Sequence, residues 1–325
     1  MVKLVNRWEG KFMHRFYLNV AVAMVLLFGI CNNVAAVVEC NRDCLTGFLN
    51  TYLQALKKHD ASGLPVTKNV KYTENGVRLN LTDGLWQTVT DLPVYRIDVV
   101  DEEAGSIGML GIIFENGNRN FFSTRLKVEK GTQVSEIENL VVRNITPSGL
   151  GNAQRNDPHP LYAEPVPENE RLSRAELVTI GDSYFTGLDT DDHGSNVPFD
   201  PECQRRENGT ETANSTNPEA RGMAKMGCKA QFDTGFSVIV TDIRERRFVA
   251  VDPVYGLAFA FGYFDHDGSI PAYKNLTTGE MVDVSPAFRQ PFSFIIAEIF
   301  KVKKGTIRQI EAVLTSVPYG MPSGW

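Results

Sequence analysis

The chain has 325 residues, of which 42% are hydrophobic and 22% are charged, and Gly and Pro occur at ordinary levels. This composition excludes a fibrous, low-complexity or mostly disordered chain, and the length predicts about two domains. The net charge is −6, and without the first 36 residues 29 basic and 38 acidic residues remain, for −9. Nucleic acid and anionic lipid both require clustered Lys and Arg, so we expect neither as a partner.

Residues 1–36 have the pattern of a secretory signal peptide. A basic stretch ends at Arg15, residues 16–30 are apolar at all but one position, and Val34 and Ala36 suit a small-residue cleavage site. The alternative is a membrane anchor, but this apolar run is shorter than the about 20 residues that cross a bilayer. We therefore expect cleavage, no stable membrane anchor, and a protein that is secreted or stays in the secretory-pathway lumen.

Sequons and cysteines agree with export. Five N-glycosylation sequons begin at Asn80, Asn144, Asn208, Asn214 and Asn275. Beyond the leader four cysteines remain, namely Cys40, Cys44, Cys203 and Cys228. An oxidising compartment favours disulfides, and the spacing contains no Cys-x-x-Cys, which argues against the alternative of a zinc site. Four cysteines allow three pairings.

The remaining chain contains two copies of one pattern, in residues 37–146 and 173–325, joined by a Pro-rich linker at 147–172. Five landmarks recur in one order: an apolar helical segment (48–56 and 177–188), Glu-Asn-Gly (74–76 and 207–209), Val-Asp (100–101 and 251–252), Lys-Val-x-Lys-Gly-Thr (127–132 and 301–306) and Ile-Glu (137–138 and 310–311). We prefer the pairing of Cys40 with Cys44 and of Cys203 with Cys228, because each bond then closes within one copy. The other two pairings stay open.

Each copy is expected to form an α+β unit. An N-terminal helix precedes several β segments, and the alternating residues of 121–142 and 292–317 predict one late hairpin in each copy. The Asn-Gly pairs of both Glu-Asn-Gly motifs suit hairpin turns, because Asn and Gly accept a positive φ. A helix lying across a curved antiparallel sheet makes a cone whose mouth is a small-molecule pocket.

Several motifs resemble a known group of proteins. They are Cys-Asn-Arg-Asp-Cys-Leu (40–45), Tyr-Thr-Glu-Asn-Gly (72–76), Asp-Gly-Leu-Trp (83–86), Glu-Asn-Gly (207–209), Gln-Phe-Asp-Thr-Gly (231–235), Phe-Asp-His-Asp-Gly (264–268) and the tail Tyr-Gly-Met-Pro-Ser-Gly-Trp (319–325). These are similar to secreted fungal proteins related to the SnoaL-like and ketosteroid-isomerase-like, or nuclear-transport-factor-2-like (NTF2-like), fold. The resemblance implies two tandem NTF2-like cone domains.

The same resemblance implies a function. It favours a cofactor-free isomerase, lyase or cyclase that acts on a small apolar carbonyl or polyketide-derived compound in fungal secondary metabolism, including the coupling of maleic anhydride units. The alternative is a non-catalytic secreted protein that binds a small apolar ligand. Fold alone does not choose between these, and an oligomer of identical chains stays open. No phosphate-binding loop, dinucleotide fingerprint or His-Glu-x-x-His motif occurs, so we expect no cofactor and no metal.

Enolisation requires an acid or base beside a carbonyl and donors for the oxyanion. The candidates are Tyr52 and Tyr184 as oxyanion donors, Asp233, Glu138 and Glu311 as carboxylates, with Glu311 at the substrate, His266 as a base, and Trp86 and Phe232 as apolar walls. Each also has a structural interpretation. A Tyr in the apolar stripe of a helix usually belongs to the core, the two Glu residues alternate with apolar neighbours and suit a solvent-facing edge, and Asp-His-Asp-Gly suits a polar turn.

Two further motifs are weaker. The segment from Ile180 to Tyr184 resembles the nucleophile block of Gly-Asp-Ser esterases, but such an enzyme needs an Asp three residues before its His, and Tyr263 stands there before His266. The loop 189–200 echoes a calcium loop, but His193 takes the fifth position, so a solvated acidic loop is favoured.

Overall fold

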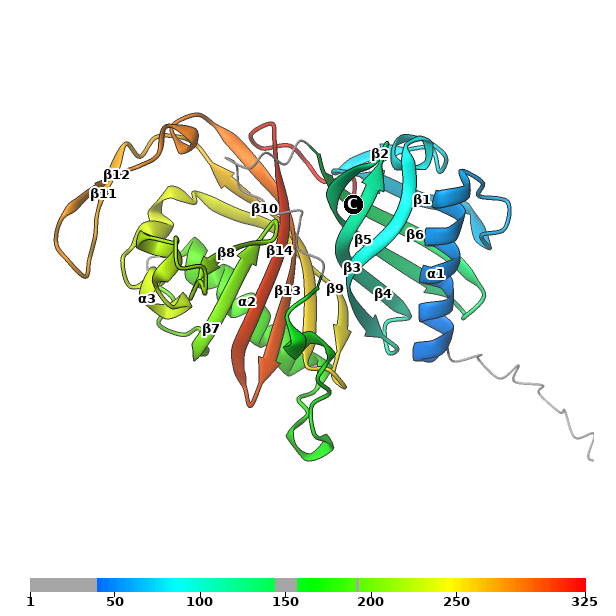
Figure 1. Ribbon diagram of the computed structural model, residues 1–325, viewed down its shortest axis with the longest axis horizontal. Coiled ribbons are helices and arrows are strands. Elements are labelled where there is room, and N and C mark those ends of the chain that lie inside the picture. The colour runs from blue at the N-terminus through cyan, green and yellow to red at the C-terminus, as the bar shows by residue number, and fades with distance from the viewer. Residues whose placement is uncertain (1–39, 144–156, 191–192) are drawn as a thin grey trace, which may run out of the picture. The chain divides into compact units, whose positions relative to one another are not determined.

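The computed structural model describes residues 40–143, 157–190 and 193–325 (Figure 1). The expected signal peptide, the sequon at Asn144 and the first part of the linker lie outside these residues. The fold is α+β, with two six-stranded curved sheets and few helices. No helix in the described part of the chain is long and apolar enough to span a membrane.

The first repeat consists of one long helix and one sheet. Its elements are α1 (Arg42–Lys58), β1 (Val66–Glu74), β2 (Val77–Leu79), η1 (Gly84–Gln87), β3 (Val89–Asp101), β4 (Ser106–Glu115), β5 (Asn118–Glu129) and β6 (Gln133–Val142). The strand order is β2-β1-β6-β5-β4-β3. All neighbours are antiparallel except β1 and β6, which pair in parallel. The expectation of a wholly antiparallel sheet was wrong, because the first long strand returns beside the last one.

The second repeat has the same plan with additions. Its elements are α2 (Arg174–Asp189), β7 (Phe199–Glu207), β8 (Thr210–Ala213), η4 (Gly222–Lys225), α3 (Cys228–Phe232), η5 (Phe236–Ile239), β9 (Asp242–Asp252), β10 (Leu257–His266), β11 (Ala272–Lys274), β12 (Met281–Asp283), η6 (Pro286–Phe288), β13 (Phe292–Lys303) and β14 (Thr306–Val317). The strand order β8-β7-β14-β13-β10-β9 repeats that of the first sheet. The hairpin β11–β12 is a separate small sheet. In the linker lie η2 (Pro160–Ala163) and η3 (Glu168–Glu170).

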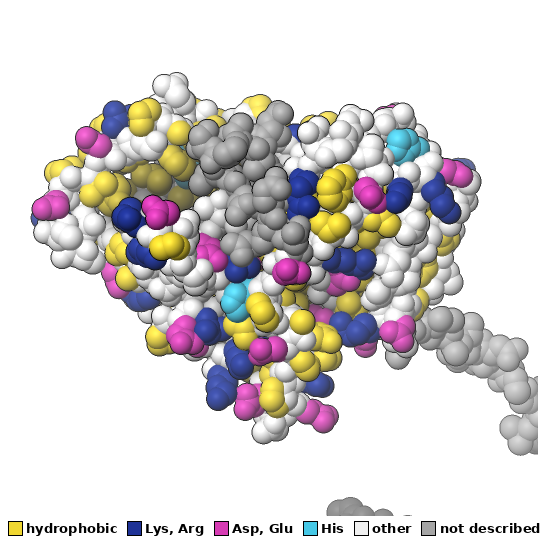
Figure 2. All heavy atoms as spheres, viewed as in Figure 1, with side chains coloured by type: hydrophobic (Ala, Val, Ile, Leu, Met, Phe, Trp, Pro, Cys, Tyr) yellow, Lys and Arg dark blue, Asp and Glu magenta, His cyan; other side chains and the backbone are white. Residues whose placement is uncertain are grey.

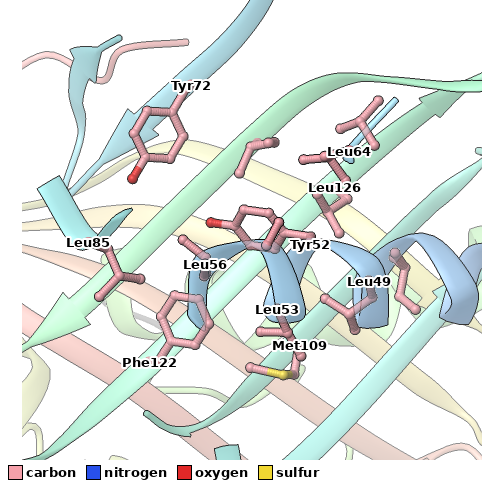
Figure 3. Packing of buried hydrophobic residues seen from close by; sticks show 14 of the residues in the cluster. Leu49, Tyr52, Leu53, Leu56, Leu64, Tyr72, Leu85, Met109, Phe122 and Leu126 are labelled. Atoms are coloured by element: carbon pink, nitrogen blue, oxygen red, sulfur yellow. The ribbon is translucent and has the colours of Figure 1, made fainter. Parts of the chain in front are cut away.

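Each long helix begins at a capping residue and covers one face of its sheet. The Asn41 side chain accepts a hydrogen bond from the Cys44 amide at 3.1 Å, and Ser173 and Glu176 form a capping box at α2. Figure 3 shows Tyr52, among other buried residues of α1, against the strands of the first sheet. We call the space between each helix and its sheet a cup, and buried side chains occupy much of both cups.

The faces away from the helices pack against each other. One buried cluster combines residues of both sheets, including Tyr95 and Phe121 of the first and Phe259 and Ile299 of the second. The solvent-facing interpretation of Glu138 and Glu311 was wrong. The sheet faces that carry these two residues are covered by the other repeat, and both side chains are buried.

Both carboxylates lie between the sheets. Glu138 forms an ion pair with Arg247 at 2.5 Å, and Glu311 accepts a hydrogen bond from the Tyr95 hydroxyl at 2.8 Å. Glu311 therefore belongs to the junction of the repeats and lies outside the second cup. A buried carboxylate needs such partners, since its desolvation is otherwise costly.

The cysteines form the preferred pairs, Cys40–Cys44 and Cys203–Cys228, with Cα–Cα distances of 5.2 and 5.7 Å. The second bond joins β7 to α3 and brackets the polar segment that contains β8 and η4. Disulfides of this kind are consistent with an oxidising compartment.

The sequons differ in what their Asn side chains do. Asn208 occupies a turn at φ 46, is 4% exposed, and its Nδ2 donates to the Leu314 carbonyl at 3.0 Å, while Asn75 makes the same bond to Val141 in the first repeat. The Nδ2 of Asn214 donates to the Cys203 carbonyl at 2.7 Å. A glycan replaces one hydrogen of the Asn side-chain nitrogen and needs solvent space around it, which the buried Asn208 side chain lacks.

We therefore expect glycans at Asn80 and Asn275 and an unmodified Asn208. Asn80 is exposed, and the Thr277 hydroxyl donates to the Asn275 side-chain oxygen at 2.7 Å in an exposed turn. Peptide mass spectrometry of protein expressed through a eukaryotic secretory pathway measures the occupancy of each site. Full occupancy of Asn208 in folded protein would contradict the structure.

Candidate ligand pocket in the second repeat

A pocket of about 290 Å³ lies at one end of the second sheet. Its walls include Phe288 of η6, Phe292 and Phe294 of β13, and Leu314 of β14, with Asn208 at the β7–β8 turn. Figure 2 shows a hollow with hydrophobic side chains in it on the half of the molecule that holds this sheet. Three aromatic rings in one wall favour a flat, unsaturated ligand, because such rings stack on it or meet its edge.

His266 lies behind this aromatic wall. Its ring stacks on Phe292 at 4.8 Å and meets the edges of Phe288 and Phe294 at 5.0 and 5.5 Å. Nδ1 lies 2.7 Å from the carbonyl oxygen of Ile239, which only accepts, so this nitrogen carries the proton. Burial lowers the pKa of His266, so the ring is neutral at pH 7.

Deeper in the cup, a row of three residues crosses each sheet at equivalent positions. In the first repeat the row on β1, β6 and β5 is Glu74, Asn139 and Thr124. In the second repeat the row on β7, β14 and β13 is Glu207, Ala312 and Glu298. The comparison of these rows separates the two cups chemically.

In the first cup the polar atoms of the row satisfy one another. Asn139 donates to the Tyr52 hydroxyl at 2.7 Å, and its oxygen accepts from Thr124 at 2.7 Å and from Tyr52 at 3.1 Å. Tyr72 donates to Glu74 at 3.3 Å. Burial raises the pKa of Tyr52 far above its ordinary value. These groups form a closed network, and such a network rigidifies a core.

In the second cup the central residue is Ala312, so the amide that closes the first network is missing. Arg205 replaces its interactions only in part. The guanidinium donates to the Tyr184 hydroxyl at 3.2 Å and to the Gln231 side chain at 2.7 Å. Because a guanidinium cannot accept, the Tyr184 oxygen is the acceptor, and its own proton has no acceptor among the described residues. Tyr184 keeps that proton, since burial raises its pKa.

Glu298 is the second donor of this cup. It shares the face of β13 with Phe294 and Phe300, and its Oε2 is buried with no hydrogen-bond partner in the described part of the chain. Burial raises the pKa of Glu298 to about 8, and nearby Glu207 raises it further while Arg205 lowers it. Glu298 is therefore a neutral acid at pH 7, with a proton to donate.

Glu207 is the opposite kind of group. Its carboxylate lies 3.3 Å from the Nε of Arg205, and its side chain is 25% exposed. Two carboxyl groups thus flank Ala312, one paired with a cation and one neutral. Two carboxyl groups in such different environments are candidates for acid and base. Ala312 is two residues from Leu314 on one strand face, so this pair lies roughly 7 Å below the pocket wall.

The structure separates the predicted site residues. Tyr184 and Phe232 lie together in the second cup with ring centroids 5.5 Å apart, and Tyr52 and Trp86 lie together in the first at 5.7 Å. Asp233 ends α3, has a side chain 43% exposed and pairs with Lys229, so it faces solvent and not the cup.

His266 and Tyr184 also belong to different places. His266 pairs with Phe292 in the sheet, six residues along β13 from Glu298, which is roughly 20 Å. His266 is therefore too far from Glu298 for both side chains to contact one small carbonyl compound. The structure does not bring His266 together with Glu298, and His266 lies behind the aromatic wall of the pocket.

The esterase interpretation also finds no support in the geometry. Ser183 lies inside α2, and its hydroxyl donates to the Ile180 carbonyl of the same helix at 2.6 Å.

Sequence reasoning missed Glu298, Glu207 and Arg205. Glu298 had a signal, because it is the only charged residue in the apolar run from 292 to 300, and such a run is typical of a strand buried on both faces. Arg205 had none, since it stands in a polar stretch whose alternation is hidden by its neighbours.

Residues 170–314 match the model of a family described as a domain of unknown function (DUF8021). This range contains Tyr184, Arg205, Glu207 and Glu298. No curated protein matches the chain.

Three solved structures are similar to part of it. A protein of unknown function with a cystatin-like fold from Methylobium petroleophilum PM1 has 10% identity and a TM-score of 0.27 over 34% of this chain and 84% of that one. AusH from Aspergillus nidulans has 14% identity and a TM-score of 0.28, over 44% of this chain and 86% of that one. AclR from Streptomyces galilaeus has 13% identity and a TM-score of 0.25, over 44% of this chain and 91% of that one.

Proposed function

We propose that the second repeat, as an NTF2-like cone, binds a small flat carbonyl compound and enolises it without a cofactor. One observation carries this proposal: the Tyr184 hydroxyl and the Glu298 carboxyl are two buried O–H donors without acceptors in the described chain, whereas their counterparts in the first cup are paired. Hydrogen-bond donors that lack an acceptor in a buried site can stabilise the negative charge that develops on a carbonyl oxygen.

The chemistry follows from these roles. The Glu207 carboxylate takes a proton from the carbon beside the carbonyl, and the electron pair of that C–H bond moves to the carbonyl oxygen. Tyr184 and Glu298 donate hydrogen bonds to this oxygen, and Arg205 strengthens Tyr184 as a donor because its charge lies against the phenol. Return of the proton at another carbon gives an isomerase.

Attack of the enolate on a second carbonyl gives a cyclase. The polyketide-derived ketones and maleic anhydride units of the resembling fungal proteins belong to the carbonyl classes that this chemistry serves. A secreted protein of this kind would act outside the cell or in the secretory lumen.

The test uses 2-tetralone, a neutral two-ring ketone with acidic C–H bonds beside its carbonyl. We expect the protein to accelerate exchange of these protons in D₂O, measured by proton NMR. Glu207→Gln and Tyr184→Phe should each reduce the exchange rate at least about 100-fold. The matched control is Tyr52→Phe, which alters the equivalent helix position of the other cup and should leave the rate unchanged.

The second candidate is the non-catalytic carrier, which the aromatic pocket wall favours independently of any donor. It predicts that 2-naphthol, which resembles the enol of 2-tetralone, binds while exchange of 2-tetralone stays at the rate in buffer. That result would contradict the enzymatic proposal.

A further inference from the structure

The two repeats differ most between the fourth and fifth strands of their sheets. In the first repeat Asn116 and Gly117 alone join β4 to β5. At the equivalent place between β10 and β13, the second repeat carries residues 267–291, which contain the hairpin β11–β12 and the short helix η6. We call residues 267–291 the cover segment. In Figure 1 it is the orange part of the ribbon at the outer side of the second sheet.

The cover segment supplies part of the pocket. Phe288 and Ala287 of η6 line it, and Phe288 also meets the His266 ring at 5.0 Å and the Phe294 ring at 6.2 Å. The first repeat has no residue in this position, because its two-residue turn is too short to reach across the cup. One of the three aromatic rings of the wall, Phe288, thus comes from a segment that only the second repeat has.

The cover segment is weakly attached. Its hairpin is not hydrogen-bonded to the main sheet, and one backbone bond, from the Leu276 amide to the Thr234 carbonyl at 3.0 Å, joins it to the body. Within the segment only Val284 is buried, and the Leu276 and Met281 side chains are 52% and 66% exposed. A segment with so few buried contacts opens at a small fraction of the cost of global unfolding.

Its two ends meet closely enough to act as a hinge. A side chain at Gly268, which has φ 74, would lie within 2.9 Å of the backbone of Arg289 and Gln290. The segment therefore leaves and re-enters the body at nearly one point, and Phe288 lies immediately beside that point. Rotation there moves η6 and the hairpin while the cup floor stays in place.

We infer that the cover segment is a hinged gate over the pocket, closed by Phe288 on the aromatic wall and latched by the bond between Leu276 and Thr234. Opening of the latch exposes the rings that lie behind Phe288, and with Phe288 in place the pocket of about 290 Å³ limits the size of the bound ligand. The inference rests on the proposed function for the nature of the ligand, but the gate itself rests on geometry.

The test measures access to His266, which lies behind the gate and is 3% exposed. Thr234 and Leu276 are joined by a backbone hydrogen bond, so we place a cysteine pair at these positions and verify the disulfide by peptide mass spectrometry. We expect the oxidised Thr234→Cys/Leu276→Cys variant to react with diethyl pyrocarbonate at His266 at least about tenfold more slowly than Thr234→Ser/Leu276→Ser. Peptide mass spectrometry follows the label, and His59 of the first repeat, whose rate should not change, is the internal reference.

Phe288→Ala tests the gate without a staple and should accelerate the labelling of His266. Equal labelling in the stapled and serine variants would overturn the gate. Binding of 2-naphthol, followed by its fluorescence, keeps the two proposals apart. If the staple slows labelling but 2-naphthol does not bind the wild-type protein, the gate stands and the proposed function fails.

Discussion

Glu298→Gln should make the protein more stable above neutral pH. Burial raises the pKa of Glu298 to about 8, whereas a carboxyl in the unfolded chain has a value near 4.5. The unfolded chain therefore binds fewer protons between these values, and the free energy of unfolding falls as pH rises through this window. Glutamine keeps the shape and never ionises, so its variant lacks this loss.

The expected gain at pH 8 is on the order of 4 kcal/mol, and the two proteins should converge near pH 4.5. Urea unfolding at pH 5 and pH 8 measures it. Glu129→Gln, at an exposed end of β5, is the control and should follow the wild type at both values. An equal pH dependence in wild type and Glu298→Gln would mean that Glu298 is ionised in the fold, and the oxyanion site would lose one donor.

Asp252→Asn should destabilise the junction of the repeats. The Asp252 carboxylate is fully buried and forms two bonds of 2.8 Å with Arg42, the first residue of α1. It also accepts from the amides of Val254 and Tyr255 in its own turn, at 3.1 and 3.3 Å. The expected loss is about 3 kcal/mol, because the variant leaves a cation and several amides with a weaker acceptor.

An equivalent ion pair joins the first residue of α2, in the second repeat, to an aspartate of the first repeat. Asp101 accepts from Arg174, the first residue of α2, at 2.9 Å, and from the Val251 amide at 3.0 Å. Asp101→Asn should therefore cost a similar amount. Asp91→Asn is the control, since Asp91 pairs with Lys57 at the surface, and this variant should unfold at almost the same urea concentration as the wild type. If urea unfolding gives Asp252→Asn the same free energy of unfolding as Asp91→Asn, the buried ion pair between Arg42 and Asp252 does not stabilise the junction of the repeats.

Local chemistry in the sequence was enough to predict several elements. The Lys-Gly turns separate β5 from β6 and β13 from β14, because Lys130 and Lys304 accept a positive φ beside a glycine. The Asn75 and Asn208 turns follow the same rule. The preferred disulfides were predicted because each bond closes within one copy, and the structure contains both.

Long-range relations could not be predicted in this way. A strand with buried residues on both faces does not indicate which face meets the helix and which meets the other repeat, so Glu311 and Glu138 were placed on the wrong side. The row that contains Glu298 and Ala312 depends on strand register, and register is fixed by pairing across the sheet and not by neighbours in sequence. The distance between His266 and Tyr184 could not be predicted either, because it depends on how the strands pair in the sheet.

Titration of 2-naphthol into the full chain, followed by ultraviolet absorbance, tests the difference between the two cups most directly. Naphthol and naphtholate absorb at different wavelengths in the ground state, and the bound anion mimics an enolate. The wild type should bind one equivalent as naphtholate, and Ala312→Asn should abolish this binding, since the introduced amide occupies Tyr184 and Glu298 as Asn139 occupies Tyr52 and Thr124. Undiminished naphtholate binding by a folded Ala312→Asn variant would contradict the assignment of the oxyanion site to the second cup.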